Sequence, residues 1–422
     1  MKQSGIDWIG EIPDDWKINQ LSQIVSQVKN KNTGLKENNL LSLSYGKIKR
    51  KNINTNDGLL PASFDGYNII SDGDIVLRLT DLQNDHTSLR VGRATEQGII
   101  TSAYTTLHPV DYDNSKYLYY ILHSFDLKKG FYGMGSGVRQ GLNYDEVKTL
   151  KVPLPPKATQ QRIAEYLDSK CAQIDSIIEE SKKSIEEYKA WKQSVIFEAV
   201  TGKNLNCKKK DSGIEWIGEI PENYKLIRLK FLFKEKLQYG ANSSGIEFTS
   251  DLPRYIRITD IKDSKTLYDE NKLSLSEEDA KDYILDDNDI LFARSGATSG
   301  KCFIYKKEIG KATFAGYLIR AKIDETKLLP NFLVLYTMTK AYEEWKNQVC
   351  IQATIQNISA EKYVNLIVPV PPLPEQESIA KMLDSKCAQI DSLITEKESL
   401  IADLTEYKKS LIFEVGTGKR SV

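Results

Sequence analysis

The sequence predicts an α+β protein in which two α/β domains are joined by two long antiparallel coiled-coil helices, as a tandem repeat with pseudo-twofold symmetry. Three observations lead to this fold class. Long segments of the chain occur twice, each half of the chain ends in an uninterrupted helical pattern of apolar residues, and short strand patterns fill the regions between the repeated segments.

The repeat is the strongest of these observations. SGIDWIGEIP at Ser4–Pro13 returns as SGIEWIGEIP at Ser212–Pro221, and Val152–Lys203 returns without a gap as Val368–Lys419. In the second pair 28 of 52 positions are identical, including the whole string LDSKCAQIDS. The chain is therefore two half-chains in tandem, each made of a leader, a middle region and a C-terminal segment.

The two middle regions have diverged much further than the segments that frame them. Only faint matches remain, such as Gly73–Leu77 with Asn288–Phe292. A shared frame suggests that two copies of one partner dock on equivalent surfaces, whereas divergent inserts suggest that two different targets are read.

Each repeated C-terminal segment is predicted to be one long helix. Apolar and small residues recur at steps of three and four, which is the seam of a coiled coil, and no proline or glycine interrupts either run. About 42 residues at ~1.5 Å per residue give roughly 60 Å per helix, and Gly202 and Gly418 stand where helix C-termini are expected. The expected seam residues are Ile163, Leu167, Cys171, Ile174, Ile178, Ser181, Ile185, Tyr188, Val195 and Ala199 in the first helix, and Ile379, Leu383, Cys387, Ile390, Ile394, Ile401, Leu404, Leu411 and Val415 in the second.

Proline-rich strings mark the exits from the two domains into the helices. Because proline lacks a backbone N–H, we expect VPLPP and VPVPP to continue neither a strand ladder nor a helix and to form stiff connections. The expected organisation is a first domain at 1–157, a first long helix at 158–202, a linker at 203–211, a second domain at 212–373 and a second long helix at 374–419.

Both middle regions are expected to be mixed α/β structures with short strands. Tyr255–Thr259 alternates apolar and polar residues like a half-buried strand, while Asp74–Leu77 and Asp289–Ala293 have the composition of buried strands. Tyr117–His123 and Phe332–Thr339 are predicted to be short apolar helices.

Polar and basic loops separate these strands at matching places in the two inserts. Arg, Lys, Asn and Gln can read base edges in a DNA groove, and neighbouring Gly, Ser and Thr allow close approach to phosphates. The candidate DNA-binding residues are Lys47, Lys49, Arg50, Arg78, Arg93, Arg139 and Gln140 in the first insert, and Arg257, Thr259, Arg294, Ser295, Thr298, Lys301, Gln352 and Gln356 in the second.

Composition excludes several other classes of protein. No apolar run approaches the ~20 residues that span a membrane, and the N-terminal segment lacks the apolar core of a signal peptide, so we expect a cytoplasmic protein. Five widely spaced cysteines form no CxxC pair and suit reduced thiols rather than a zinc site. The formal net charge of zero means that any basic DNA footprint must be local or partly supplied by partners.

Motifs of catalysis and of nucleotide binding are missing or incomplete. SGATSGK has one residue too few between its glycines for a P-loop, and Cys302 follows its lysine where Ser or Thr is needed. No NPPY-type run for adenine methylation and no HExxH occurs. We therefore expect no catalytic residues, no metal site and no cofactor on this chain.

Taken together, the motifs resemble those of type I restriction-modification DNA specificity (S) subunits. The resemblance rests on the two WIGEIP leaders, RYIRITDI at Arg254–Ile261, DILFARSGATSGK at Asp289–Lys301 and VPVPPLPEQESIAKMLD at Val368–Asp384, and it covers essentially the whole chain. The first half departs from the pattern at Lys157–Thr159 and Gln161, and it lacks the RYIRITDI string, which Arg78–Asp81 only approximates.

By this resemblance each insert is a target recognition domain that reads one part of a bipartite double-stranded DNA site. The helices set the spacing and dock two methyltransferase subunits, which bind S-adenosylmethionine, while motor-nuclease subunits use ATP and Mg. The resemblance thus implies a non-catalytic subunit of an N6-adenine methyltransferase and restriction endonuclease complex.

Three aromatic residues on the helices exceed what a two-helix seam can bury. We expect Trp191, Phe197 and Phe413 to bind the partner subunits, although packing against the chain's own domains would explain them equally well. Two other functions stay open at this point. One is a coiled-coil adaptor whose inserts bind protein, and the other is a DNA-modifying enzyme with an unrecognised site.

Overall fold

The chain divides into two units whose segments are interleaved in sequence. The computed structural model describes residues 1–53, 61, 63–134, 141–350 and 357–422. Unit 1 comprises Met1–Lys182 and Glu398–Val422, and unit 2 comprises Lys183–Lys397. Each unit therefore contains one repeated leader, one insert, and part of each long helix.

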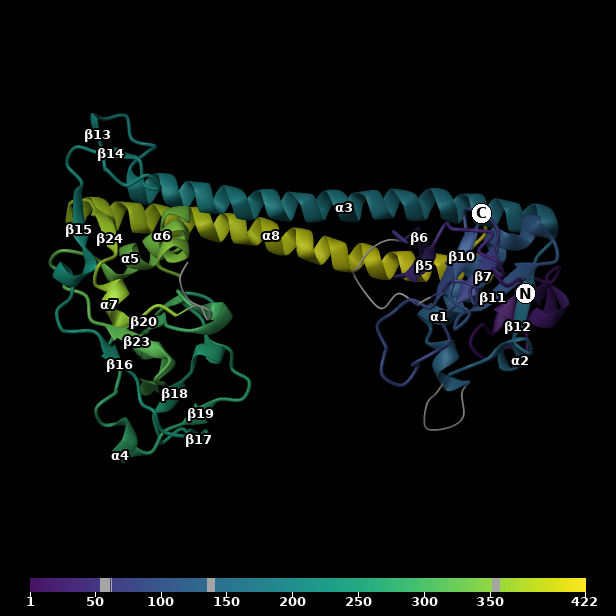
Figure 1. The fold of residues 1–422 in the computed structure, drawn as a ribbon, viewed down its shortest axis with the longest axis horizontal. Coiled ribbons are helices and arrows are strands. Elements are labelled where there is room, and N and C mark those ends of the chain that lie inside the picture. Colours follow the sequence, from purple (N-terminus) through teal and green to yellow (C-terminus); the bar gives the residue numbers. More distant parts are fainter. Residues whose placement is uncertain (54–60, 62, 135–140, 351–356) are drawn as a thin grey trace. The chain divides into compact units, whose positions relative to one another are not determined.

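The long helices are α3 (Lys157–Thr201) and α8 (Leu373–Gly416). In unit 1, Lys408 Nζ of α8 lies 2.6 Å from Asp175 Oδ1 of α3. In unit 2, Lys192 Nζ of α3 lies 2.7 Å from Asp391 Oδ2 of α8. These are the same two positions of the repeat with the helices exchanged. Within each unit, the segments of the two helices run antiparallel (Figure 1). The fold class predicted from the sequence is confirmed.

Apolar seam residues join these helix segments to the core of their own unit. In unit 1, Leu167 and Ile174 of α3 are buried in one cluster with Leu411 and Val415 of α8. In unit 2, Ile196, Ala199 and Val200 of α3 share a cluster with Ile379 and Leu383 of α8. Each core thus takes residues from two helices that are distant in sequence.

Unit 1 contains a four-stranded antiparallel sheet in the order β4-β11-β8-β9. A hairpin, two further strand pairs and the leader hairpin surround it. The elements are β1 (Lys2–Gln3), β2 (Glu11–Ile12), β3 (Lys17–Gln20), β4 (Val25–Gln27), β5 (Leu41–Ser44), β6 (Lys47–Arg50), β7 (Asn68–Ile70), β8 (Ile75–Leu77), β9 (Val91–Arg93), β10 (Gly98–Ile100), β11 (Thr105–Pro109), α1 (Ser115–Leu127), α2 (Tyr144–Val147) and β12 (Lys151–Leu154).

Unit 2 contains a sheet of the same order, β16-β23-β20-β21, and a second sheet β17-β19-β18-β22 in which β18 and β22 are parallel. Its elements are β13 (Lys209–Asp211), β14 (Glu219–Pro221), β15 (Lys225–Arg228), β16 (Gln238–Tyr239), β17 (Ile246–Glu247), β18 (Arg254–Ile256), β19 (Leu273–Ser274), α4 (Glu277–Ala280), β20 (Ile290–Ala293), β21 (Cys302–Ile304), β22 (Ala312–Phe314), β23 (Leu318–Ala321), α5 (Pro330–Thr337), α6 (Lys340–Cys350), α7 (Ala360–Tyr363) and β24 (Ile367–Val370).

The matching sheet order extends the repeat into the diverged inserts. β8 and β20 are fully buried and lie between equivalent neighbours, so the buried strands expected at Asp74–Leu77 and Asp289–Ala293 are confirmed. The expected apolar helices are α1 and α5.

The strand expected at Tyr255–Thr259 is wrong in its second half. β18 ends at Ile256, and a 3-10 turn follows at Ile258–Asp260. The backbone N–H of Arg257 donates to Asp260 Oδ2 at 2.8 Å, so a local carboxylate closes a turn where alternation alone predicted extended chain.

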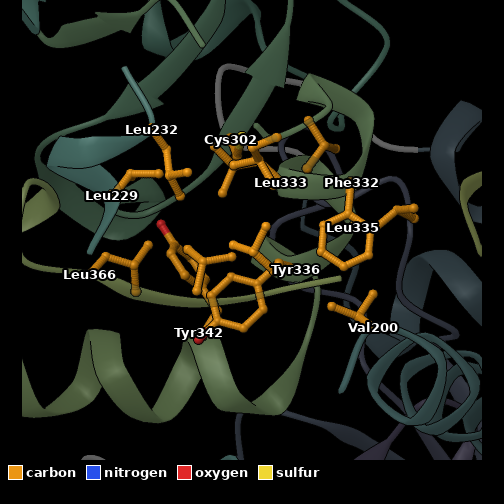
Figure 2. Packing of buried hydrophobic residues seen from close by; sticks show 14 of the residues in the cluster. Val200, Leu229, Leu232, Cys302, Phe332, Leu333, Leu335, Tyr336, Tyr342 and Leu366 are labelled. Atoms are coloured by element: carbon orange, nitrogen blue, oxygen red, sulfur yellow. The ribbon is translucent and has the colours of Figure 1, made fainter. Parts of the chain in front are cut away.

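In unit 2, α5 and α6 cover the four-stranded sheet and the end of α3. Figure 2 shows Phe332, Leu333 and Tyr336 of α5 in one cluster with Cys302 of β21 and Val200 of α3. Burial of this cluster fixes β20 and β21 against the helices, and the loop between those two strands starts from a rigid base.

Each long helix ends on the leader of its unit. Gly418, with φ +75°, follows α8 in unit 1, and an added Cβ would lie 2.5 Å from Pro13 Cδ. Gly202, with φ +70°, follows α3 in unit 2, and its Cβ would overlap the ring of Pro221. In each unit, the glycine with positive φ at the end of the helix thus packs against the proline of the WIGEIP leader. This contact explains why the leader and the helix repeat together.

Substituting these glycines should destabilise the chain beyond the cost of the left-handed backbone. Gly10 has a similar φ of +74° but open space around it, so Gly10→Ala should cost about 1–2 kcal/mol from backbone strain alone. Gly418→Ala should cost a further ~1–3 kcal/mol, because its methyl group meets Pro13. Denaturant unfolding of both variants measures the difference, and equal losses would contradict this account of the helix end.

A buried histidine should make stability fall in acid. Burial, and then the charge of Lys408, lowers the pKa of His123 to about 4, whereas the unfolded imidazole titrates near 6.5. The stability contributed by the neutral ring is therefore complete above pH ~6.5 and is lost as pH falls towards 4, by about 3 kcal/mol in all. His123→Phe should flatten the unfolding free energy over this range, and parallel pH curves for the two proteins would refute the assignment.

Candidate nucleic-acid interface

In unit 1, the predicted basic cluster Lys47, Lys49 and Arg50 lies on β6, the mostly exposed strand of the hairpin β5-β6. Ser44 pairs with Lys47 across a two-residue turn, whose Tyr45 and Gly46 both have positive φ. Lys47 Nζ lies 3.4 Å from Asp175 Oδ2, and Arg50 Nε donates to both carboxylate oxygens of Glu96 at 2.8 Å.

The three cations of this hairpin differ in how far they are already paired. The bond from Arg50 holds the pKa of the Glu96 carboxyl below its usual range. Lys49 is exposed and makes no ion pair with the residues that the structure describes. Of the cations on β6, Lys49 is therefore the one best placed to bind a phosphate of the DNA backbone.

Arg78 and Arg93 are held inside unit 1. Arg78 Nη2 lies 3.6 Å from Asp85 Oδ2. Arg93 donates from Nε to Ser115 Oγ at 2.8 Å, and its Nη2 lies 3.3 Å from Asp72 Oδ1. Both guanidinium groups are mostly buried, so their first role is to hold loops of the domain together.

Sequence reasoning missed Arg90, which has more hydrogen-bond partners than any other arginine among the described residues of unit 1. Its side chain is fully buried and donates to the carbonyl oxygens of Thr80 at 2.6 Å and Asp81 at 3.2 Å, and to Tyr132 Oη at 3.0 Å. Arg90 thus folds the loop between β8 and β9 around a cation. Its place in a polar and basic segment of the sequence suggests a surface residue, and only its burial in the structure shows that Arg90 has a structural role.

In unit 2, Arg257 and Thr259 lie at the turn after β18. Arg257 donates from Nε and Nη2 to the two oxygens of Asp260, at 3.1 and 2.7 Å, and from Nη2 to Asn271 O at 2.8 Å. The hydrogen bond to Asp260 raises the pKa of Arg257. Thr259 is exposed beside this pair, with Oγ1 3.4 Å from Asp260 Oδ1. The guanidinium of Arg257 is thus largely engaged within the domain.

Arg294, Ser295, Thr298 and Lys301 are brought together on the loop from β20 to β21. A short 3-10 turn at Gly296–Thr298 shapes the loop, and Lys301 is exposed at its end. Arg294 forms no ion pair or side-chain hydrogen bond with described residues, and its guanidinium carbon lies 5.0 Å from the ring centroid of Tyr239. Among the candidate residues of unit 2 that the structure describes, those of this loop are the least engaged with the rest of the domain.

Hydrogen bonding confirms the equivalence of the two loops that the faint match of Gly73–Leu77 with Asn288–Phe292 indicates. The N–H of Leu142 donates to Leu79 O at 2.9 Å, and the N–H of Ile358 donates to Arg294 O at 2.8 Å. The counterpart of Arg294 is therefore Leu79, which is buried, and not Arg78. Four further candidates, Arg139, Gln140, Gln352 and Gln356, lie outside the described residues.

The three aromatic candidates for partner binding have different surroundings. Trp191 of α3 is 51% exposed. Phe413 of α8 packs against Trp8, with ring centroids 6.3 Å apart. The ring centroid of Phe197 lies 4.5 Å from Lys203 Nζ. Tyr407, which is 47% exposed, occupies the position on α8 that is equivalent to Trp191. Of these two exposed aromatic residues at equivalent positions, the sequence analysis identified Trp191 and missed Tyr407.

Among the described residues no group of three or more His, Cys, Asp or Glu side chains is arranged to hold a metal ion. Within the same part of the chain, no helix is both long and apolar enough to cross a membrane.

Comparison with known proteins agrees with this architecture. The family model for the type I restriction modification DNA specificity domain matches residues 13–187 and 212–402. The MjaVIII type I restriction enzyme specificity subunit of Methanocaldococcus jannaschii is 24% identical, over 97% of this chain and 93% of its own length.

Two solved structures share the fold. One, from a study of complex assembly and conformational transition in the type I R-M system, has a TM-score of 0.73 at 14% identity and covers 97% of this chain and 100% of the other. The HsdS subunit from Thermoanaerobacter tengcongensis has a TM-score of 0.55 at 13% identity, with 100% of both chains covered. Since the family model matches twice and over most of the sequence, this chain belongs to the family of type I restriction-modification DNA specificity subunits.

Proposed function

We propose that this chain confers DNA specificity on a type I restriction-modification complex without catalysing a step itself. Each half reads one part of a bipartite double-stranded site, and the two helices set the spacing and dock methyltransferase subunits. The observation that carries the proposal is that the same frame occurs in both units, with sheets of equivalent order and the equivalent ion pairs Lys192–Asp391 and Lys408–Asp175. The two inserts held by this frame differ in their surface cations.

The division of labour follows from that frame. The target recognition domains are assigned to 1–157 and 212–373, the helices to 158–202 and 374–419, and the linker to 203–211. Two methyltransferase subunits, one for each frame, would bind S-adenosylmethionine and methylate adenine at N6. Motor-nuclease subunits would use ATP and Mg, and all of this would take place in the cytoplasm.

Within the proposed DNA surface, the candidate residues separate by what already engages them. Lys49, Arg294 and Lys301 have no ion pair among the described residues, so we assign them to DNA. Arg50, Arg93 and Arg257 have carboxylate partners, so each would have to exchange a protein bond for a DNA bond. Their substitution should weaken the fold of a loop as well as DNA binding.

Single-molecule mapping of methylated adenines in host DNA, with and without this chain, tests the proposal directly. A bipartite motif that appears only when the chain is present is the expected result. Methylation that is unchanged by its removal would refute a role in specificity.

Lengthening the helices should change the spacer of that motif and not its two half-sites. Four residues inserted after Ser181 add about one helical turn, ~5.4 Å, which exceeds one base-pair step of ~3.4 Å. The methylation map of this variant should show a longer spacer. The same four residues inserted in the linker after Cys207 are the control and should leave the spacer unchanged. If both variants keep the original spacer, the helices do not set it.

The exposed aromatic pair should contribute to methyltransferase docking. Trp191→Ala combined with Tyr407→Ala should lower methyltransferase copurification at least tenfold, because exposed aromatic side chains are common hot spots of interfaces. Phe231→Ala is the matched control, since Phe231 is 60% exposed but lies outside the two helices. Copurification that is unchanged in the double variant would exclude this surface.

A further inference from the structure

The backbone of Arg294 is held on both sides at the end of β20. Its N–H donates to Tyr317 O at 3.0 Å, and its carbonyl oxygen accepts bonds from the N–H of Ile358 at 2.8 Å and from Ser299 Oγ at 3.3 Å. β20 itself is buried. The side chain of Arg294 therefore starts from a fixed point, as a residue that must select a ligand by geometry requires.

The guanidinium is oriented by an aromatic ring and not by a carboxylate. Its central carbon lies 5.0 Å from the ring centroid of Tyr239, and Tyr239 Oη in turn accepts the N–H of Ala360 at 3.1 Å. Two nearby arginines of unit 2 pair instead with acids, Arg257 with Asp260 and Arg254 with Asp269.

The donors of Arg294 lack acceptors within the described part of the chain. Nε is buried and has no hydrogen-bond partner there. A guanidinium keeps five N–H donors in one plane, and a buried donor without an acceptor is unfavourable. The arrangement is that of a binding group whose acceptor comes from another molecule.

The surroundings of Arg294 leave room for that molecule. Gly296, two residues further on, has φ +75° and open space where a Cβ would be. Tyr317, whose carbonyl accepts the Arg294 N–H, is 63% exposed, and Lys301 at the end of the loop is exposed as well. A duplex could approach this loop closely, with a cation beside the arginine for a phosphate.

The two domains differ at this position in a way that fits base reading. A phosphate contact would be useful to both domains, because every DNA half-site has the same backbone. The first domain instead has the buried Leu79 in the equivalent place, and its equivalent of Lys301 is the buried Arg90. A planar donor present in only one domain suits recognition of a base that only that domain reads.

We propose that Arg294, oriented by the ring of Tyr239, reads a guanine in the half-site of the second domain by donating to O6 and N7 in the major groove. This inference rests on the proposed function. Tyr239 is a positioning residue, which acts through Arg294 and need not touch the DNA.

Replacing guanine N7 by carbon removes one of the two acceptors and tests the contact. The complete complex is bound to duplexes that carry the mapped site, with 7-deazaguanine at each guanine of the second half-site in turn. For the unaltered chain, one such substitution should weaken binding about tenfold. In the Arg294→Ala complex the same substitution should change binding by less than about twofold, because the donor is already gone.

Variants of Tyr239 separate positioning from a structural role. Tyr239→Phe keeps the ring and should preserve the sensitivity to 7-deazaguanine, whereas Tyr239→Leu should reduce it at an unchanged thermal midpoint. Lys301→Ala is the contrasting variant, and it should weaken all duplexes alike and lower the salt dependence of binding.

The outcomes distinguish this inference from the function on which it rests. Retained 7-deazaguanine sensitivity in Arg294→Ala, or no sensitive guanine in the second half-site, would overturn the inference while leaving sequence-specific binding intact. Equal weakening of all duplexes by Arg294→Ala would make it a phosphate contact and would also overturn guanine reading. A wild-type complex without sequence preference would overturn the proposed function itself.

Discussion

The antiparallel pairing of the two long helices is the constraint on which the rest of the structure depends. In unit 1 the pairing joins Lys408 to Asp175, and in unit 2 it joins Lys192 to Asp391. Such partly exposed ion pairs contribute little energy individually, so the buried seam supplies most of the stability and the charges favour one register. Because each unit takes a segment of both helices, the core of each requires chain segments far apart in sequence.

The identical string LDSKCAQIDS shows how one sequence serves both the helix pair and the domain beside it. The first aspartate of the string pairs in each unit with a lysine of the adjacent domain. Lys116 Nζ lies 2.6 Å from Asp168 Oδ2, and Lys265 Nζ lies 2.7 Å from Asp384 Oδ1. The second aspartate, Asp175 or Asp391, forms the ion pair with the lysine of the other long helix. The two domain lysines are not equivalent in the repeat, so the inserts diverged while the attachment point on the helix remained.

The same divergence explains why basic loops were poor guides to the candidate site. Arg90 folds its own loop, Arg257 is held by Asp260, and Arg93 is held by Ser115 and Asp72. A guanidinium with carboxylate or carbonyl acceptors nearby is a structural group, and without them it can serve a ligand. The structure thus divides chemically similar residues into those that build the domains and those left to bind.

The sequence by itself determined the tandem repeat, the long helices with their glycine ends, and the buried strands β8 and β20, because these follow from local periodicity and from identity at a fixed offset. Tertiary structure alone decided which cations are engaged, because burial and pairing depend on contacts distant in sequence. It decided that Leu79, the counterpart of Arg294, is buried, whereas Arg294 keeps a donor without a partner among the described residues. It also brought Tyr239 beneath the guanidinium of Arg294, although Arg294 follows Tyr239 by 55 residues in the chain. This contact depends on the pairing of β16 with β23, which no local sequence pattern predicts.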